Sequence, residues 1–238
     1  MVTLIRHGQA GSRLNYDDLS AIGHEQSRAV GEWFAQRGIR FDAIITGGLN
    51  RQKKTAREIV AAMEEQGIAS PSPVVDERWS EFDLDAVYAG MGPHLAREDE
   101  RFRLEYEELQ REASNPGSAA HRAWRNCDVT VVRAWIERRF EFQGESFADF
   151  VSRVRDTLLS LPAQGCVAVI TSATPIGVSA GAALDLAPRR VMQLAGAQRN
   201  TAFTEMDFRS GDPRLDSLRL TSFNNVPHLR EARLLTSR

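Results

Sequence analysis

The chain has 238 residues, of which 42% are hydrophobic and 26% charged, a composition typical of a globular protein long enough to bury a substantial core. Thirty Lys and Arg residues against 32 Asp and Glu residues give a formal net charge of −2. This balance gives no general reason to bind nucleic acid or an anionic membrane, so any anion site has to be local.

Cysteine content and apolar run length exclude several further classes. The two cysteines, Cys127 and Cys166, have no CxxC spacing, so neither a disulfide framework nor a cysteine-based zinc site is expected. The sequence does not start with a basic segment followed by a long apolar one, and no run of about 18 apolar residues occurs. These features predict a cytoplasmic protein without a signal peptide or a membrane span.

Three compact apolar runs predict buried strands, at residues 2–5, 41–46 and 166–171. Each run is rich in β-branched residues, as expected for strands of a sheet that is covered on both faces.

Helical patterns alternate with these runs. They predict a helix capped by Ser20 and stopped by Gly38, helices over about 49–66 and 146–161, and a helix opened by Thr174 as N-cap and Pro175. The alternation predicts a three-layer αβα sandwich with a mostly parallel central sheet.

The middle of the chain differs, and we interpret residues 86–145 as a helical insertion laid over one end of the sheet of a single domain, 1–238. The charged run from Arg97 to Glu112 is interpreted as a solvated helix face, and "SNPGS" at 114–118 as a turn. Trp124 and Trp135 recur at helical spacing and are interpreted as packing residues rather than ligand-stacking ones.

Side chains suited to phosphate chemistry follow the predicted strands. Arg6, His7 and Gly8 end the first strand, Arg51 lies in the helix after the second, and Ser172 follows the third. Ligands of open α/β sheets bind beyond the carboxyl ends of the strands, where arginines can grip phosphate and a neutral imidazole can attack phosphorus. Gly8 is expected to let the backbone approach the ligand. A capping or surface role for the Arg-His pair stays open on these residues alone.

Several segments resemble the histidine phosphatase superfamily, which includes the phosphoglycerate mutases. In chain order they are "LIRHGQA", "LSAIGHEQSRAVGEWF", "GGLNRQKKTAREI" and "DERWSEFD". The resemblance implies that His7 attacks the phosphoryl group and becomes phosphohistidine, that Arg6 and Arg51 hold the phosphoryl oxygens, and that Glu81 supplies and removes the proton. It implies neither a metal nor an organic cofactor.

One position departs from the family pattern. The family places a second histidine after the third strand, where this chain has Ser172. A serine hydroxyl can donate one hydrogen bond to a phosphate oxygen but cannot carry positive charge, and loss of one preorganised donor costs roughly 10²–10³ in turnover. Of the other histidines, His24 is expected to be exposed and His228 structural, while His94 and His121 belong to the predicted insertion.

Two functions therefore stand as hypotheses, with a small phosphorylated substrate or inorganic phosphate as the ligand. The first is a phosphatase of reduced activity, and the second is a phosphate-binding module without turnover. A phosphoglycerate mutase is less favoured, because a mutase needs a phosphoenzyme that resists water. Neither the substrate nor the oligomeric state can be read from the sequence.

Overall fold

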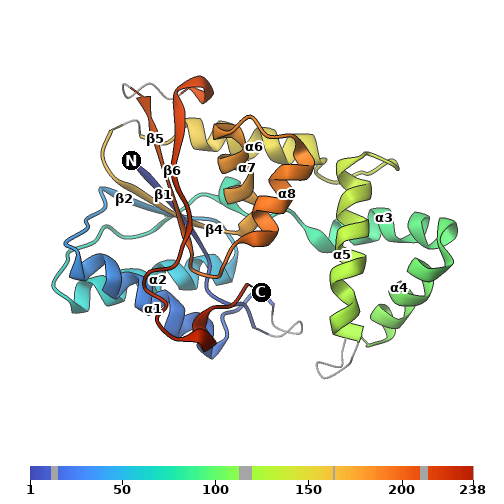
Figure 1. Cartoon of the computed structure of the whole chain (residues 1–238), viewed down its shortest axis with the longest axis horizontal. Coiled ribbons are helices and arrows are strands. Elements are labelled where there is room, and N and C mark those ends of the chain that lie inside the picture. Colours follow the sequence, from blue (N-terminus) through green and yellow to red (C-terminus); the bar gives the residue numbers. More distant parts are fainter. Residues whose placement is uncertain (12–15, 113–119, 163, 210–213, 238) are drawn as a thin grey trace. The chain divides into compact units, whose positions relative to one another are not determined.

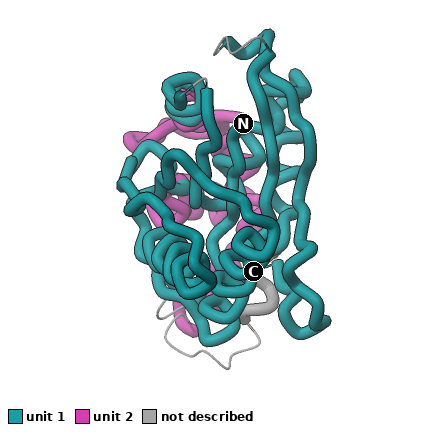
Figure 2. Tube along the Cα trace, turned by 90° about the vertical axis from the view of Figure 1, so that its left-hand side faces the viewer, with its two compact units in different colours: residues 1–11, 15–81, 153–238 teal, residues 12–14, 82–152 magenta. Residues whose placement is uncertain are grey.

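The computed structural model describes residues 1–11, 16–112, 120–162, 164–209 and 214–237, with the backbone alone for 120–126. The chain divides into two compact units (Figure 2). The first unit contains residues 1–11, 15–81 and 153–238, and the second contains residues 12–14 and 82–152. That the second unit is an insertion into a single domain stays a prediction.

A six-stranded sheet forms the centre of the first unit, in the order β3-β2-β4-β1-β5-β6 (Figure 1). The strands are β1 (Val2–Arg6), β2 (Ala43–Thr46), β3 (Val74–Val75), β4 (Val167–Thr171), β5 (Phe203–Phe208) and β6 (Leu218–Asn225). β1, β4, β2 and β3 pair in parallel, whereas β5 pairs antiparallel with both β1 and β6. The predicted mostly parallel α/β sheet is confirmed.

The three predicted strands correspond to β1, β2 and β4, and every residue of β1 and β4 is buried. The sequence analysis missed the other three strands. β3 has only two residues, both exposed, and β6 at the opposite edge carries polar residues along its length. Edge strands bury little surface, so no apolar run marks them.

Helices cover both faces of this sheet (Figure 1). The first unit contains α1 (Ala21–Gln36), α2 (Asn50–Glu65), the end of α6 (Phe147–Leu159), α7 (Ala173–Ala183) and α8 (Pro188–Ala197). On one face, Val30 and Phe34 of α1 and Ile59 of α2 form a buried cluster with Ile5 and Phe203. α7 lies on the opposite face together with α8 (Figure 1). The layers are those of an αβα sandwich.

Most predicted helix ends agree with the structure. The Ser20 hydroxyl accepts from the Gly23 N–H at 3.0 Å and caps α1, and Gly38 follows the helix with a φ of +64°. The predicted start of α7 is wrong. This helix begins at Ala173, with Ser172 as its N-cap residue, so Thr174 and Pro175 lie in its first turn. Proline is tolerated there because the first N–H groups of a helix have no intrahelical partner.

The second unit is helical. It contains α3 (Leu84–Glu98), α4 (Glu100–Glu112), α5 (Ala120–Ile136) and the start of α6 (Phe147–Leu159). Trp135 is buried and packs against the rings of Phe82 and Phe147, which supports its interpretation as a packing residue. The predicted turn at 114–118 and the Trp124 side chain lie outside the described residues.

None of the described helices is both long enough and apolar enough to span a bilayer. The cytoplasmic location stays a prediction.

Candidate active site

The predicted phosphate-binding segments meet at the carboxyl ends of the parallel strands. Arg6 of β1 pairs with Thr171 of β4, so His7 and Ser172 leave two adjacent strands side by side. The His7 N–H continues this pairing, donating to the Thr171 carbonyl at 2.8 Å. On the other side of β4, the Gly47 N–H after β2 donates to the Ile170 carbonyl at 3.0 Å, and α2 starts three residues later.

The His7 imidazole is 3% exposed and is bonded at both ring nitrogens. Nδ1 lies 2.7 Å from the Gly8 carbonyl oxygen, and the Arg51 Nε–H donates to Nε2 at 3.2 Å. A carbonyl oxygen only accepts and a guanidinium only donates, so the network assigns the ring proton to Nδ1 and a lone pair to Nε2. Nε2 is therefore the nitrogen that can act as a nucleophile.

The electrostatic surroundings keep this ring neutral. Burial of the imidazole, followed by the positive charges of Arg51 and Arg6, lowers the pKa of His7 well below its ordinary value of 6.5. The bond to the Gly8 carbonyl acts in the opposite direction without reversing the shift. A site with two guanidinium groups thus holds an unprotonated histidine at neutral pH.

The backbone around His7 is held by polar side chains. The His7 carbonyl accepts from Asn200 Nδ2 and from the Thr201 N–H, each at 3.3 Å. The Gly8 N–H donates to Thr55 Oγ1 of α2 at 3.0 Å. These bonds connect the nucleophile to β5 through the preceding turn and to α2, which fixes its position before any ligand arrives.

The structure gives a different reason for glycine at position 8 from the one expected. A Cβ added to Gly8 would lie 2.4 Å from the Gly23 carbonyl oxygen and 2.8 Å from Ser27 Oγ. Likewise, a Cβ added to Gly23 would lie 2.2 Å from the Gln9 carbonyl oxygen. The two glycines allow the chain after β1 to pack closely against α1, and the expected approach of the Gly8 backbone to a ligand stays a prediction.

Both arginines are buried at the site. Arg6 Nη1 donates to the carbonyls of Gln198 at 2.6 Å and Ser237 at 3.1 Å. Arg51 Nη1 pairs with Asp17 Oδ1 at 3.2 Å. The positive charges of both guanidinium groups add to burial in lowering the pKa of His7.

Two helix N-termini at the site already hold carboxylates. Asp17 Oδ2 accepts from the Asn50 N–H of α2, and Glu81 Oε2 accepts from the Thr174 N–H of α7, each at 3.2 Å. Free N–H groups and the helix dipole favour negative charge at such ends. The arrangement favours anions, and it places the predicted acid Glu81 beside Thr174 in the first turn of α7.

Ser172 is 1% exposed, and its hydroxyl accepts a hydrogen bond of 2.9 Å from Gln52 Nε2. Although Ser172 is the N-cap residue of α7, its side chain makes no capping bond. Neither Gln52 nor Asp17 was predicted from the sequence. The burial of Gln52 and its bond to Ser172 become visible only in the structure, and Asp17 lies in a loop whose path the sequence does not specify.

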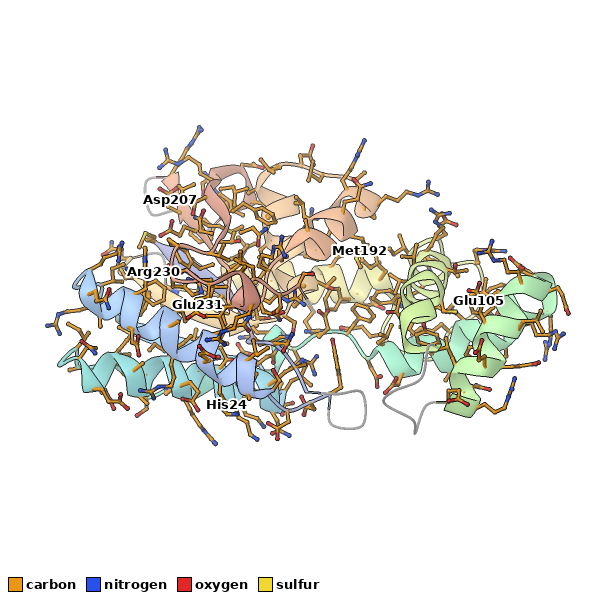
Figure 3. The ribbon with its side chains drawn as sticks, turned by 60° about the horizontal axis from the view of Figure 1, so that its bottom comes forward. His24, Glu105, Met192, Asp207, Arg230 and Glu231 are labelled. Carbon is orange, nitrogen blue, oxygen red and sulfur yellow. The ribbon has the colours of Figure 1, made fainter. Side chains whose placement is uncertain are left out.

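Of the remaining histidines described in the first unit, neither is bonded to Ser172. His24 projects from α1 and pairs with Glu58 at 2.8 Å (Figure 3). His228 is buried, its Nε2 lies 3.0 Å from Thr201 Oγ1, and burial lowers its pKa to about 4. In the second unit, His94 is exposed and stacks on Phe140, and the His121 side chain lies outside the description.

The described residues contain no group of three or more His, Cys, Asp or Glu side chains that could hold a metal ion. Both cysteines are free thiols. Burial, reinforced by the neighbouring Glu105 and Asp128 carboxylates, raises the pKa of Cys127 to about 12, so this thiol is not reactive (Glu105 is labelled in Figure 3).

Comparison with known proteins adds to this geometry. The pattern of the histidine phosphatase superfamily (branch 1) matches residues 2–221, which confirms the resemblance seen in the motifs. A 2,3-bisphosphoglycerate-dependent phosphoglycerate mutase of Mesorhizobium japonicum is 33% identical over 69 residues, 26% of this chain and 34% of the relative. The same enzyme of a Methylobacterium species is 33% identical over 90 residues, covering 35% and 42%. The chain thus matches less than half the length of these relatives.

Solved structures share the fold over nearly the full length. Phosphoserine phosphatase of Entamoeba histolytica in complex with 3-phosphoglyceric acid has a TM-score of 0.60 at 20% identity, covering 96% of this chain and 98% of the other. A mycobacterial glucosyl-3-phosphoglycerate phosphatase with inorganic phosphate has a TM-score of 0.57 at 21% identity, also covering 96% and 98%. At these identities the likeness establishes the fold alone.

Proposed function

The chain belongs to branch 1 of the histidine phosphatase superfamily, and on this premise we propose that it hydrolyses a phosphomonoester through a phosphohistidine at His7. The observation that carries the proposal is the state of the His7 ring. Its Nε2 is unprotonated, buried and 3.2 Å from the Arg51 guanidinium, while Nδ1 is bonded to the Gly8 carbonyl. This is the arrangement that a nitrogen nucleophile for phosphorus needs.

In the first step, His7 Nε2 forms a bond to phosphorus as the bond from phosphorus to the ester oxygen breaks. The ring becomes a phosphorylated imidazolium that keeps its proton on Nδ1, and the Gly8 carbonyl oxygen 2.7 Å away stabilises the new positive charge. Arg6 and Arg51 neutralise the charge that spreads over the phosphoryl oxygens, which is where phosphoryl transfer gains most of its acceleration.

Glu81 serves as the proton carrier in this proposal. It donates a proton to the departing ester oxygen and then takes one from the water that attacks the phosphohistidine. The second step breaks the phosphorus–nitrogen bond, releases inorganic phosphate and returns His7 to its starting state. The bond from the Thr174 N–H to Glu81 Oε2 supports a fixed position for this carboxyl at the start of α7.

Ser172 contributes a neutral hydrogen-bond donor where the family pattern has a histidine. The phosphoryl group is then surrounded by one cationic side chain fewer, so we expect slower turnover than a site with two histidines. The same observation favours the second candidate, a binding module that retains the Arg6 and Arg51 pocket without turnover. A mutase is less favoured, because it requires a water-resistant phosphoenzyme.

A chromogenic phosphomonoester assay separates the two candidates. The wild-type protein is expected to release the chromophore, whereas His7→Ala is expected to be inactive and to keep its melting temperature. Wild-type protein that binds inorganic phosphate but turns over no faster than His7→Ala would instead identify a binding module.

A further inference from the structure

Gln52 is a fully buried amide in the first turn of α2, directly after Arg51. Its Oε1 accepts from the Leu49 N–H at 3.1 Å. Its Nε2 donates to Ser172 Oγ at 2.9 Å and to the Trp79 carbonyl at 3.4 Å. One side chain thus connects the start of α2 to the end of β4 and to the segment that leads to Glu81.

The partners fix the orientation of the Gln52 amide. A rotation by 180° would place the NH₂ group against the Leu49 N–H, two donors facing each other, and the amide oxygen against the Trp79 carbonyl, two acceptors. The NH₂ group therefore points to Ser172. It follows that the Ser172 hydroxyl acts as an acceptor toward Gln52.

That bond determines what the Ser172 proton can do. A hydroxyl has one proton, and the bond from Gln52 is the only hydrogen bond of the Ser172 side chain to the described residues. With a lone pair occupied by Gln52, the O–H remains available to donate in another direction. Ser172 and His7 lie side by side at the ends of two adjacent strands, so a phosphoryl group attached to His7 would lie next to Ser172.

We propose that Gln52 is a positioning residue that fixes Ser172 as a neutral hydrogen-bond donor to the phosphoryl group bound at His7. The inference rests on the proposed function and extends it, because it makes the Gln52–Ser172 pair the substitute for the missing second histidine. The donation requires no protonation, so this position adds no titration of its own to the activity.

Helix capping alone does not account for this geometry. The bond from the Leu49 N–H to Oε1 is half of a capping box, but the bond from Nε2 to Ser172 satisfies no helix end. Glycine at position 47 provides the space for the amide, since a Cβ there would lie 2.2 Å from Gln52 Oε1. Gly47, Gln52 and Ser172 therefore form one packing unit next to the nucleophile.

The test is a double-mutant cycle of Gln52→Met and Ser172→Ala, measured as turnover of a chromogenic phosphomonoester and as affinity for inorganic phosphate. Each single variant is expected to lower kcat/KM by roughly 10²- to 10³-fold, the range for loss of one preorganised donor. The double variant is expected to be no worse than Ser172→Ala, because Gln52 acts through the hydroxyl. Independent losses that multiply in the double variant would overturn the inference.

Gln52→Glu provides a second test that keeps the size of the side chain and the acceptor for the Leu49 N–H. The introduced carboxylate can only accept from Ser172, so it turns the hydroxyl proton away from the phosphoryl group. Activity is expected to fall at neutral pH and to recover relative to wild type as the pH is lowered and the carboxyl is protonated. A pH profile parallel to wild type would overturn the inference even if Gln52→Met failed to fold.

The matched control is Gln193→Glu, the same change at an exposed position of α8, whose activity and pH profile should equal those of wild type. The outcomes separate the two proposals. An active wild type with multiplicative losses overturns only the role of Gln52. A wild type that neither hydrolyses phosphomonoesters nor binds phosphate overturns the proposed function and this inference with it.

Discussion

The Arg51 Nε–H donates to the Nε2 of His7 across 3.2 Å, so the cation and the nucleophilic nitrogen are in contact in the buried site. A phosphoryl group attached to Nε2 is necessarily within reach of the same guanidinium. We therefore expect two effects from this one position: together with burial, the larger cause, Arg51 lowers the pKa of His7 and keeps the imidazole neutral, and in the proposed mechanism it neutralises the charge that develops on the phosphoryl oxygens.

Arg51→Lys tests this dual role. Lysine keeps the positive charge but lacks the planar set of donors that can bond to Nε2 and to phosphoryl oxygens together. We expect kcat/KM to fall by roughly 10²–10³ in steady-state kinetics. Arg57→Lys, at an exposed position of the same helix, is the control and should leave kcat/KM unchanged. Equal activity of the two variants would contradict the role of Arg51.

The pH dependence of activity follows from the lowered pKa of His7. Only the neutral imidazole, with a lone pair on Nε2, can attack phosphorus. Because the pKa of His7 is lowered, this neutral form persists to more acidic pH. We expect kcat/KM to persist below the ordinary histidine value of 6.5, with the acid limb of the profile displaced below it. Activity that appears only above neutrality would contradict the assigned state of His7.

We expect Asp17 to compete with a bound anion. Its carboxylate accepts from Arg51 Nη1 and from the Asn50 N–H, two donors that also suit phosphate. Asp17→Asn removes the negative charge, so we expect KM and the inhibition constant of inorganic phosphate to fall by roughly three- to tenfold, equivalent to about 1 kcal/mol. Asp156→Asn, exposed on α6, should change neither. Weaker phosphate inhibition after Asp17→Asn would show that the carboxylate positions Arg51 rather than competing with the ligand.

Stability should depend on pH through two buried histidines. Burial lowers the pKa of His228 to about 4 and that of His7 well below 6.5, so between these values the unfolded chain binds protons that the folded chain does not. The free energy of unfolding therefore decreases as the pH falls below about 6.5. Each histidine contributes at most about 1.4 kcal/mol per pH unit to this decrease. Urea unfolding of wild type and His228→Gln near pH 5 and pH 7 measures this, and the variant should show the smaller pH dependence. An equal dependence would assign the effect to other groups.

Where burial was complete, the sequence indicated the fold. Val2–Arg6 and Val167–Thr171 are buried at every position, so uninterrupted apolar runs marked them as strands. Strands β3, β5 and β6 and the start of α7 were not predicted correctly. There, the structure depends on pairing with β1 and β5 and on the path of the chain after Thr171, neither of which leaves a periodic pattern.

The site was predictable to the extent that topology controls it. Parallel strands have their carboxyl ends on the same side of the sheet, so the residues that follow adjacent strands lie close together. His7 and Ser172, which follow β1 and β4, are such a pair. The bond from Gln52 to Ser172 joins residues 120 positions apart and depends on the orientation of one amide, which no spacing rule specifies. Gly8 was linked to ligand approach because its contact with the backbone of α1 is visible only in three dimensions.

Rapid-quench trapping on Glu81→Gln shows whether His7 Nε2 carries the phosphoryl group during turnover. With p-nitrophenyl phosphate the leaving group needs no proton, so this variant should release about one nitrophenolate per protein and then stall for lack of a base. We expect acid-labile, alkali-stable phosphate on His7 and neither burst nor label in a His7→Ala, Glu81→Gln double variant. Phosphate on another residue, or a burst that survives the loss of His7, would contradict it.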